Sequence, residues 1–182
     1  AFKQSGVLSA GTLEELFDWA KALCWLPRVK DGVAILTNGG GIGVLATDEA
    51  SDQGLTLSNL TEATAARLKE SDCFPREMVF NNPLDIIGDA DTERYRSAME
   101  ILLNQKDINT LVVIQTKQTM TDIQANMEAI VDMAKKHPAK ALISVCLPGR
   151  LSQPAINWLE SHHIPNYSDP ARALKAARRL IY

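Results

Sequence analysis

Short apolar runs alternate regularly with longer amphipathic stretches along this chain. The apolar runs are four to seven residues long where they are strongest, with one weaker run of three, and they fall at 33–37, 55–57, 109–115, 141–147 and 164–167. Several are apolar through consecutive positions, which is typical of strands buried on both faces. The pattern predicts a parallel sheet between two layers of helices.

The stretches between these runs carry helix signals. Thr12 with Glu15 forms a capping box, Pro27 stops the helix that follows, and Pro170 lies in the first turn of the last helix. Five strands interleaved with helices predict an α/β class with a doubly wound parallel five-stranded sheet, and we expect the flavodoxin-like order 2-1-3-4-5. The expected helices cover 12–26, 42–53, 61–70, 92–103, 122–136, 152–162 and the residues from 168 onward.

Length and composition narrow the class of protein. With 182 residues, 46% hydrophobic and 23% charged, and a net charge of −3, the chain fits one globular domain with an appendage. No basic excess favours nucleic acid, and the apolar runs are too short for a membrane span. Cys24, Cys73 and Cys146 show no paired spacing, so neither a disulfide framework nor a metal site is expected, and a reducing cytoplasm is the expected compartment.

The start of the chain resembles the middle of a longer protein. Residues 1–4 carry no initiator Met or signal core, and they are typical of the last turn of a helix closed by Gly6. We therefore expect residues 1–30 to be the end of a preceding domain plus a linking helix. Residues 31–182 are expected to form the α/β domain.

The first candidate site is the glycine turn after the first strand, where backbone N–H groups at a helix N-terminus suit an anion. A loose dinucleotide fingerprint is present, but the expected second strand ends at 57–59 without a carboxylate for a ribose, which disfavours a nicotinamide cofactor. No Lys-Ser/Thr pair follows, so the turn is not a P-loop. A tight turn that packs helix against strand explains the same residues. The candidate phosphate-binding or substrate-binding residues are Asn38, Gly39, Gly40 and Gly41.

The second candidate site is the loop after the third expected strand, residues 115–121, which leads into a helix. Lys117, Gln118 and Thr119 are polar groups at the positive end of that helix and suit a phosphate or carboxylate. An ordinary solvated loop capped by Thr121 is the alternative. Asp85 could position a substrate or simply form an Asx turn.

The sequence does not indicate a complete catalytic site within this chain. The three histidines, His137, His162 and His163, are interpreted as surface residues, and no Ser-His-Asp or Cys-His arrangement falls at the strand ends. The first strand ends in Thr37 and Asn38 without a phosphoacceptor aspartate, so a response-regulator receiver is disfavoured.

Several motifs together resemble one family, the ADP-forming acetyl-CoA synthetases. The resemblance covers essentially the whole chain, whose α/β part is similar to the C-terminal domain of the succinyl-CoA synthetase β subunit. The stretches that carry it are 1–7, 12–18, 36–48, 82–90 with 93–95, and 115–122. Many relatives have proline where this chain has Ile42 and Lys117, and the succinyl-CoA enzymes have glycines in the second loop.

The resemblance implies a reaction that converts acyl-CoA, ADP and phosphate into carboxylate, ATP and CoA through an acyl phosphate and a phosphohistidine. It places the phosphohistidine shortly upstream of Ala1, and the CoA-binding and ATP-grasp parts in other domains or subunits. CoA, ATP or ADP and Mg²⁺ are then expected for the full-length protein, and no cofactor for this fragment. Asn38 and residues 117–119 would face the carboxylate and the phosphohistidine. The fragment alone would be inactive, and the assembly could be oligomeric.

A non-catalytic synthetase-like domain of a protein lysine acetyltransferase is the alternative. In that class the phosphorylated histidine is lost, and the domain would serve binding or regulation.

Overall fold

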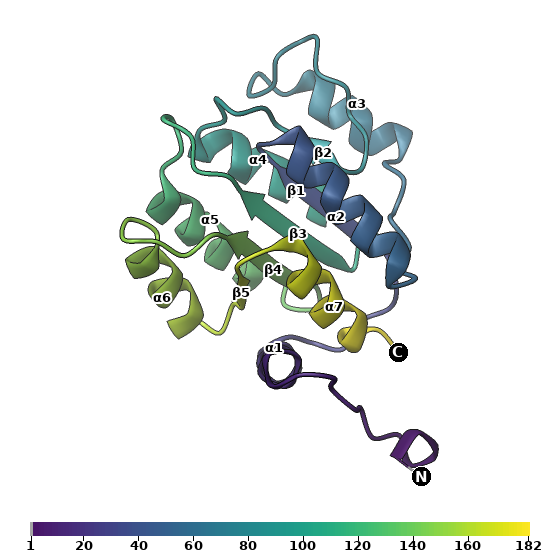
Figure 1. The fold of residues 1–182 in the computed structure, drawn as a ribbon. Helices are drawn as coiled ribbons and strands as arrows, with labels where there is room; N and C mark the ends of the chain where they lie inside the picture. Colours follow the sequence, from purple (N-terminus) through teal and green to yellow (C-terminus); the bar gives the residue numbers. More distant parts are fainter. Residues whose placement is uncertain (1) are drawn as a thin grey trace.

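The computed structural model describes residues 2–182, with side chains from Gln4 onward. It confirms a flavodoxin-like α/β fold with a five-stranded parallel sheet in the order β2-β1-β3-β4-β5 (Figure 1). The strands are β1 (Val33–Thr37), β2 (Leu84–Asp85), β3 (Thr110–Gln115), β4 (Ala141–Cys146) and β5 (Asn166–Tyr167).

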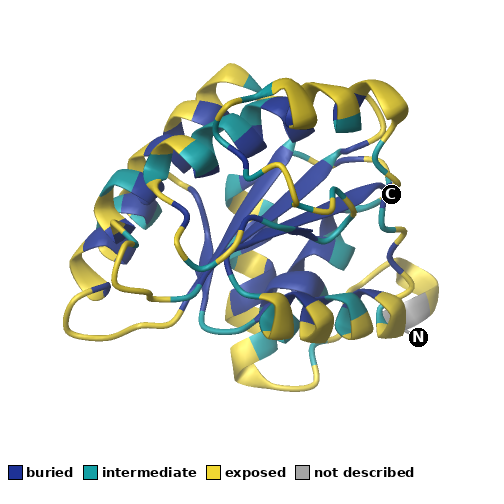
Figure 2. Ribbon diagram, turned by 90° about the horizontal axis from the view of Figure 1, so that it is seen from above, coloured by how far each residue is buried: buried dark blue, intermediate teal, exposed yellow. Residues whose placement is uncertain are grey.

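Helices cover both faces of the sheet, and buried strands run between the two layers (Figure 2). Alternate residues of β1, β3 and β4 enter opposite cores: Ile35 faces one layer and Leu36 the other. One layer holds α1 (Leu13–Trp25), α2 (Gly40–Asp52) and α7 (Pro170–Leu180). The other holds α3 (Glu62–Glu70), α4 (Thr92–Leu103), α5 (Ile123–Lys136) and α6 (Gln153–Ser161).

The edge of the sheet beyond β1 corrects one prediction. Residues 55–57 were expected to form the second strand, but only Leu57 pairs there, in a single parallel bridge to Val33. The strand proper is β2, in which Leu84 pairs with Leu36. Between these two contacts the amide of Asn82 stands in for a strand residue. It accepts from the Ile35 N–H at 3.0 Å and donates to the carbonyls of Val33 and Ser58 at 2.8 and 2.9 Å.

Helix ends follow the local chemistry of the sequence. The side chains of Thr12 and Thr61 accept N-cap hydrogen bonds as predicted, from the N–H groups of Glu15 and Thr64. For α5 the cap predicted as an alternative was wrong, because Asp122 and not Thr121 accepts from the Ala125 N–H at 3.0 Å. Helix α2 begins two residues earlier than expected, since its first turn includes the glycines.

Helix α1 packs on the α/β body through α7. The buried carboxylate of Asp18 accepts two hydrogen bonds from the guanidinium of Arg172, both at 2.7 Å, and this raises the pKa of Arg172. The Tyr167 hydroxyl donates to the Asp18 carbonyl at 2.8 Å. Before α1, residues 2–5 form one 3-10 turn, Gly6 has φ +71°, and the chain extends away from the body (Figure 1). Ala1 lies outside the described residues.

The boundary at residue 30 stays a prediction. Across the described chain, no helix is long and apolar enough to cross a membrane.

Candidate functional site

Three loops converge at the carboxyl ends of the strands. They follow β1 at 38–39, β2 at 86–88 and β3 at 116–122, and the helices that come next, α2 and α5, lie on opposite faces of the sheet. This reversal between β1 and β3 is the topological switch point, where ligands bind in open α/β sheets. Most of the predicted site residues therefore meet at one place.

The side chain of Asn38 joins the first loop to the third. Its Oδ1 accepts from the backbone N–H of Thr116 at 2.7 Å and from the Thr116 hydroxyl at 2.9 Å, while its Nδ2 donates to the Thr116 carbonyl at 2.9 Å. The residue is 1% exposed. These contacts use both ends of the amide, so Asn38 holds the two loops together. Its influence on a ligand would therefore be indirect, through the position of the backbone of these loops.

The glycine segment forms the N-terminus of α2. Gly39 is the N-cap residue, no side chain caps the helix, and no acidic residue lies in its first turn. A Cβ on Gly41 would meet nothing within 4 Å, whereas one on Gly43 would approach the Thr37 methyl group at 3.1 Å. Both interpretations of the glycine segment therefore have support: Gly43 packs the helix against the strand, and Gly40 and Gly41 are exposed in a first turn that no side chain caps.

The N-terminus of α5 differs because the carboxylate of Asp122 already caps it. Before it, the Gln118 N–H donates to the Thr121 hydroxyl at 3.2 Å, and Gln118 Nε2 donates to the Thr116 hydroxyl at 3.2 Å. Gln118 also lies against Gly88 of the second loop. Lys117 and Thr119 are exposed. The two helix ends therefore differ: that of α5 is capped by a carboxylate, whereas that of α2 has no side-chain cap and lies beside the carboxylate of Asp85.

Asp85 ends β2 beside the glycines. Its Oδ1 accepts from the Ile87 N–H at 2.9 Å, which confirms the Asx turn, and its Oδ2 lies 3.0 Å from where a Cβ on Gly40 would stand. The edge strand therefore does end in a carboxylate, because the strand beside β1 is β2 and not residues 55–57. Asp85 still follows the glycines by far more than the ~20 residues typical of a dinucleotide site.

A cavity of about 680 Å³ opens between the loops after β3 and β4. The loop after β4 at 147–152 was not predicted to belong to the site, although Pro148 and Gly149 mark a turn at the same edge of the sheet. Burial raises the pKa of the Cys146 thiol to about 11, so this wall of the cavity carries a neutral thiol. The lining residues are Ile42, Gln115, Thr116, Lys117, Ile123, Val145, Cys146, Leu147, Pro148, Gly149, Arg150, Leu151, Ser152 and Ser168.

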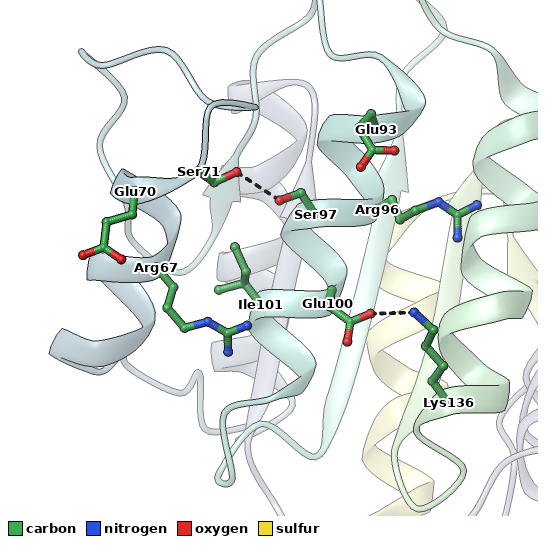
Figure 3. Close-up of a pocket in the computed structure, with 9 residues that line it drawn as sticks. All are labelled: Arg67, Glu70, Ser71, Glu93, Arg96, Ser97, Glu100, Ile101 and Lys136. Carbon is green, nitrogen blue, oxygen red and sulfur yellow. Dashed lines mark hydrogen bonds and ion pairs between the residues drawn. The ribbon is translucent and has the colours of Figure 1, made fainter.

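A second depression, of about 490 Å³, lies on the outer surface of α3, α4 and α5 (Figure 3). Its charges balance, and the Glu100 carboxylate accepts from Lys136 Nζ at 3.0 Å, which lowers the pKa of Glu100. It is lined by Arg67, Glu70, Ser71, Glu93, Arg96, Ser97, Glu100, Ile101 and Lys136. Helix surfaces, and not strand ends, form this groove, and it carries none of the predicted site residues.

The histidines lie away from the strand-end site. His162 and His163 are exposed beside α6, and His137 ends α5 half-buried, with its pKa lowered by burial. Within residues 2–182, no group of three or more His, Cys, Asp or Glu side chains is placed to hold a metal ion.

These features define a class: a doubly wound α/β domain whose three strand-end loops meet at the switch point. Similarity to known proteins specifies this class further. The chain belongs to the Ligase-CoA domain family, which matches residues 33–177.

Its relatives include subunits of ADP-forming enzymes. The chain is 37% identical to the acetate–CoA ligase (ADP-forming) I subunit alpha of Pyrococcus furiosus over 99% of its own length and 39% of that protein. It is 36% identical to the acetate–CoA ligase (ADP-forming) I of Archaeoglobus fulgidus, of which it spans 24%. A structure of acetyl-coenzyme A synthetase 1 from Ca. Korarchaeum cryptofilum superposes with a TM-score of 0.90 at 34% identity, covering 98% of this chain and 39% of that one.

Proposed function

We propose that this chain is the domain of an ADP-forming acyl-CoA synthetase that faces the phosphohistidine and the carboxylate substrate. The family membership and the convergence of three loops at the uncapped end of α2 support this assignment. The whole protein would convert acyl-CoA, ADP and phosphate into carboxylate, ATP and CoA. One solved relative, the Korarchaeum synthetase, is described as a complex with phosphate and ADP.

In this proposal the phosphate lies at the N-terminus of α2. Backbone N–H groups of Gly40 and Gly41 would donate to its oxygens, and the helix field, worth roughly 1 kcal/mol, would offset part of the repulsion from the Asp85 carboxylate beside Gly40. Asn38 would fix the distance between this helix end and the loop of Lys117. The chemistry itself would need a histidine and nucleotide from other domains.

A substitution at Gly41 tests this arrangement in the full-length protein. A carboxylate there would meet no steric obstacle and would suit the helix, but it would oppose the phosphate. Gly41→Asp should lower the steady-state level of phosphohistidine formed from labelled ATP, and the neutral, equally sized Gly41→Asn should not. Gln118→Asp, at the capped end of α5, should act less. Equal phosphorylation in all three would overturn the placement.

The other parts of the proposal concern the complete protein. It would bind CoA, ATP or ADP, and Mg²⁺ through further domains or subunits, and it would work in the cytoplasm. The isolated chain should make no acyl-CoA, so ADP-forming turnover by these 182 residues alone would contradict the assignment. The second candidate, which comes from the sequence resemblance, is a non-catalytic domain of a protein lysine acetyltransferase. A full-length protein that forms no phosphohistidine would favour it.

A further inference from the structure

The strand-end cavity has an apolar wall on both sides of the sheet. Ile42 from α2 and Ile123 from α5 face it from opposite layers, and Val145 and Cys146 supply its floor at the end of β4. Leu147 and Leu151 on its rim are more than 60% exposed. A volume of about 680 Å³ is in the range of sites for small organic ligands and far larger than acetate needs.

The charged groups that line the cavity all have one sign. Lys117 on the loop after β3 and Arg150 on the loop after β4 are exposed cations, and none of the lining residues is acidic. One anionic group at the rim would therefore be favoured. A second anionic group at the far end of a ligand, away from these two cations and against Ile42, Ile123 and Val145, would lose its hydration without a cationic partner.

From these two properties we infer that the cavity binds monocarboxylic acids with a sizeable apolar body, such as a medium-length alkyl chain or an aryl group. The carboxylate lies toward Lys117 and Arg150, and the apolar body covers Ile42, Ile123 and Val145. The inference rests on the proposed function, since it names the acid that such a synthetase would use. It separates this chain from a site built for acetate or for a dicarboxylate.

Direct binding to the 182-residue chain tests the inference without turnover. Acetate, butyrate, hexanoate, 3-phenylpropionate and succinate would be titrated at constant ionic strength and followed by amide NMR. Each methylene added from acetate to hexanoate should strengthen binding roughly threefold to fourfold. Succinate is the matched control for butyrate, because it exchanges the terminal methyl group for a carboxylate, and it should bind more weakly than butyrate. The shifted signals should include Ile42, Ile123 and Val145.

Two variants with matched controls locate the site. Ile42→Trp fills the cavity from the first turn of α2 and should weaken hexanoate binding roughly tenfold or more. Val44→Trp places the same ring on the exposed face of the same helix and should have no effect. Arg150→Glu should weaken every monocarboxylate by roughly fivefold. Arg67→Glu, in the remote groove on α3, should not.

The inference fails if the affinities are equal along the series, if succinate binds as tightly as butyrate, or if no acid binds. It also fails if Ile42→Trp leaves hexanoate binding intact, or if the cavity proves to receive a segment of a partner domain and excludes the acids. The proposed function fails separately, when the full-length protein forms no phosphohistidine. If longer acids still bound this protein more tightly, the inference about the cavity would hold even though the proposed function had failed.

Discussion

The amide of Asn38 and the backbone of Thr116 hydrogen-bond in both directions, at 2.7 Å and 2.9 Å, as two paired strand residues would. The contact lies just past the carboxyl ends of β1 and β3, where the sheet itself no longer holds the two segments together. One side chain therefore sets how far the glycine segment stands from the loop of Lys117.

Asn38→Ala should lower the free energy of unfolding by about 2 to 4 kcal/mol, because it leaves the Thr116 N–H without its acceptor and the Thr116 carbonyl with only the Thr121 hydroxyl at 3.4 Å. It should also speed amide hydrogen exchange at residues 116–121. Urea denaturation and exchange NMR would measure both effects. Asn157→Ala, an exposed amide on α6, is the control and should change neither. Unchanged exchange in the loop would show that Asn38 does not position it.

Asn82→Ala should destabilise the sheet edge by a similar amount, about 2 to 4 kcal/mol, since three backbone groups depend on that amide. The effect should be local, with increased hydrogen exchange at Ile35. The neighbouring Asn81→Ala is the comparison, as Asn81 is exposed. If both variants unfold at the same urea concentration as the parent, Asn82 is not the bridge between the two halves of the edge.

The cysteines should differ in reactivity. Burial raises the pKa of the Cys146 thiol to about 11, while Cys24 is exposed on α1. At pH 8, iodoacetamide should modify Cys24 first and leave Cys146 intact until the chain unfolds. Peptide mass spectrometry along a labelling time course would show the order. Early modification of Cys146 would mean that the cavity floor opens to solvent.

Stability should fall as the pH drops below the ordinary pKa of histidine, about 6.5. Burial lowers the pKa of His137 in the folded protein, so the unfolded chain takes up a proton first. The contribution is complete above pH 6.5 and is lost as the pH falls through the lowered native pKa. His137→Gln should flatten the dependence of urea stability on pH between 5 and 7. The exposed His162→Gln should keep the parental slope.

The sequence predicted the helices and strands of this fold wherever neighbouring residues alone determine them. The apolar runs became β1, β3 and β4, the Thr12 and Thr61 caps formed, and α4 has the predicted bounds of 92–103. The strand order agrees with the flavodoxin-like order that we expected among doubly wound folds. Within the candidate site, local sequence identified the loops after β1 and β3, since their glycines and polar residues follow buried strands directly.

Contacts between distant segments settled the rest. Residues 55–57 have the apolar character of a strand, yet β2 formed at 84–85, because pairing with β1 depended on the bridge that Asn82 builds some 25 residues further along the chain. The sequence named Asn38 as a site residue but gave no sign of its partner Thr116, which lies 78 positions away. The cavity wall at 147–152 was missed for the same reason. Propensity and burial pattern act over a few neighbouring residues, whereas pairing across a sheet edge and the enclosure of a cavity exist only once the strands stand side by side.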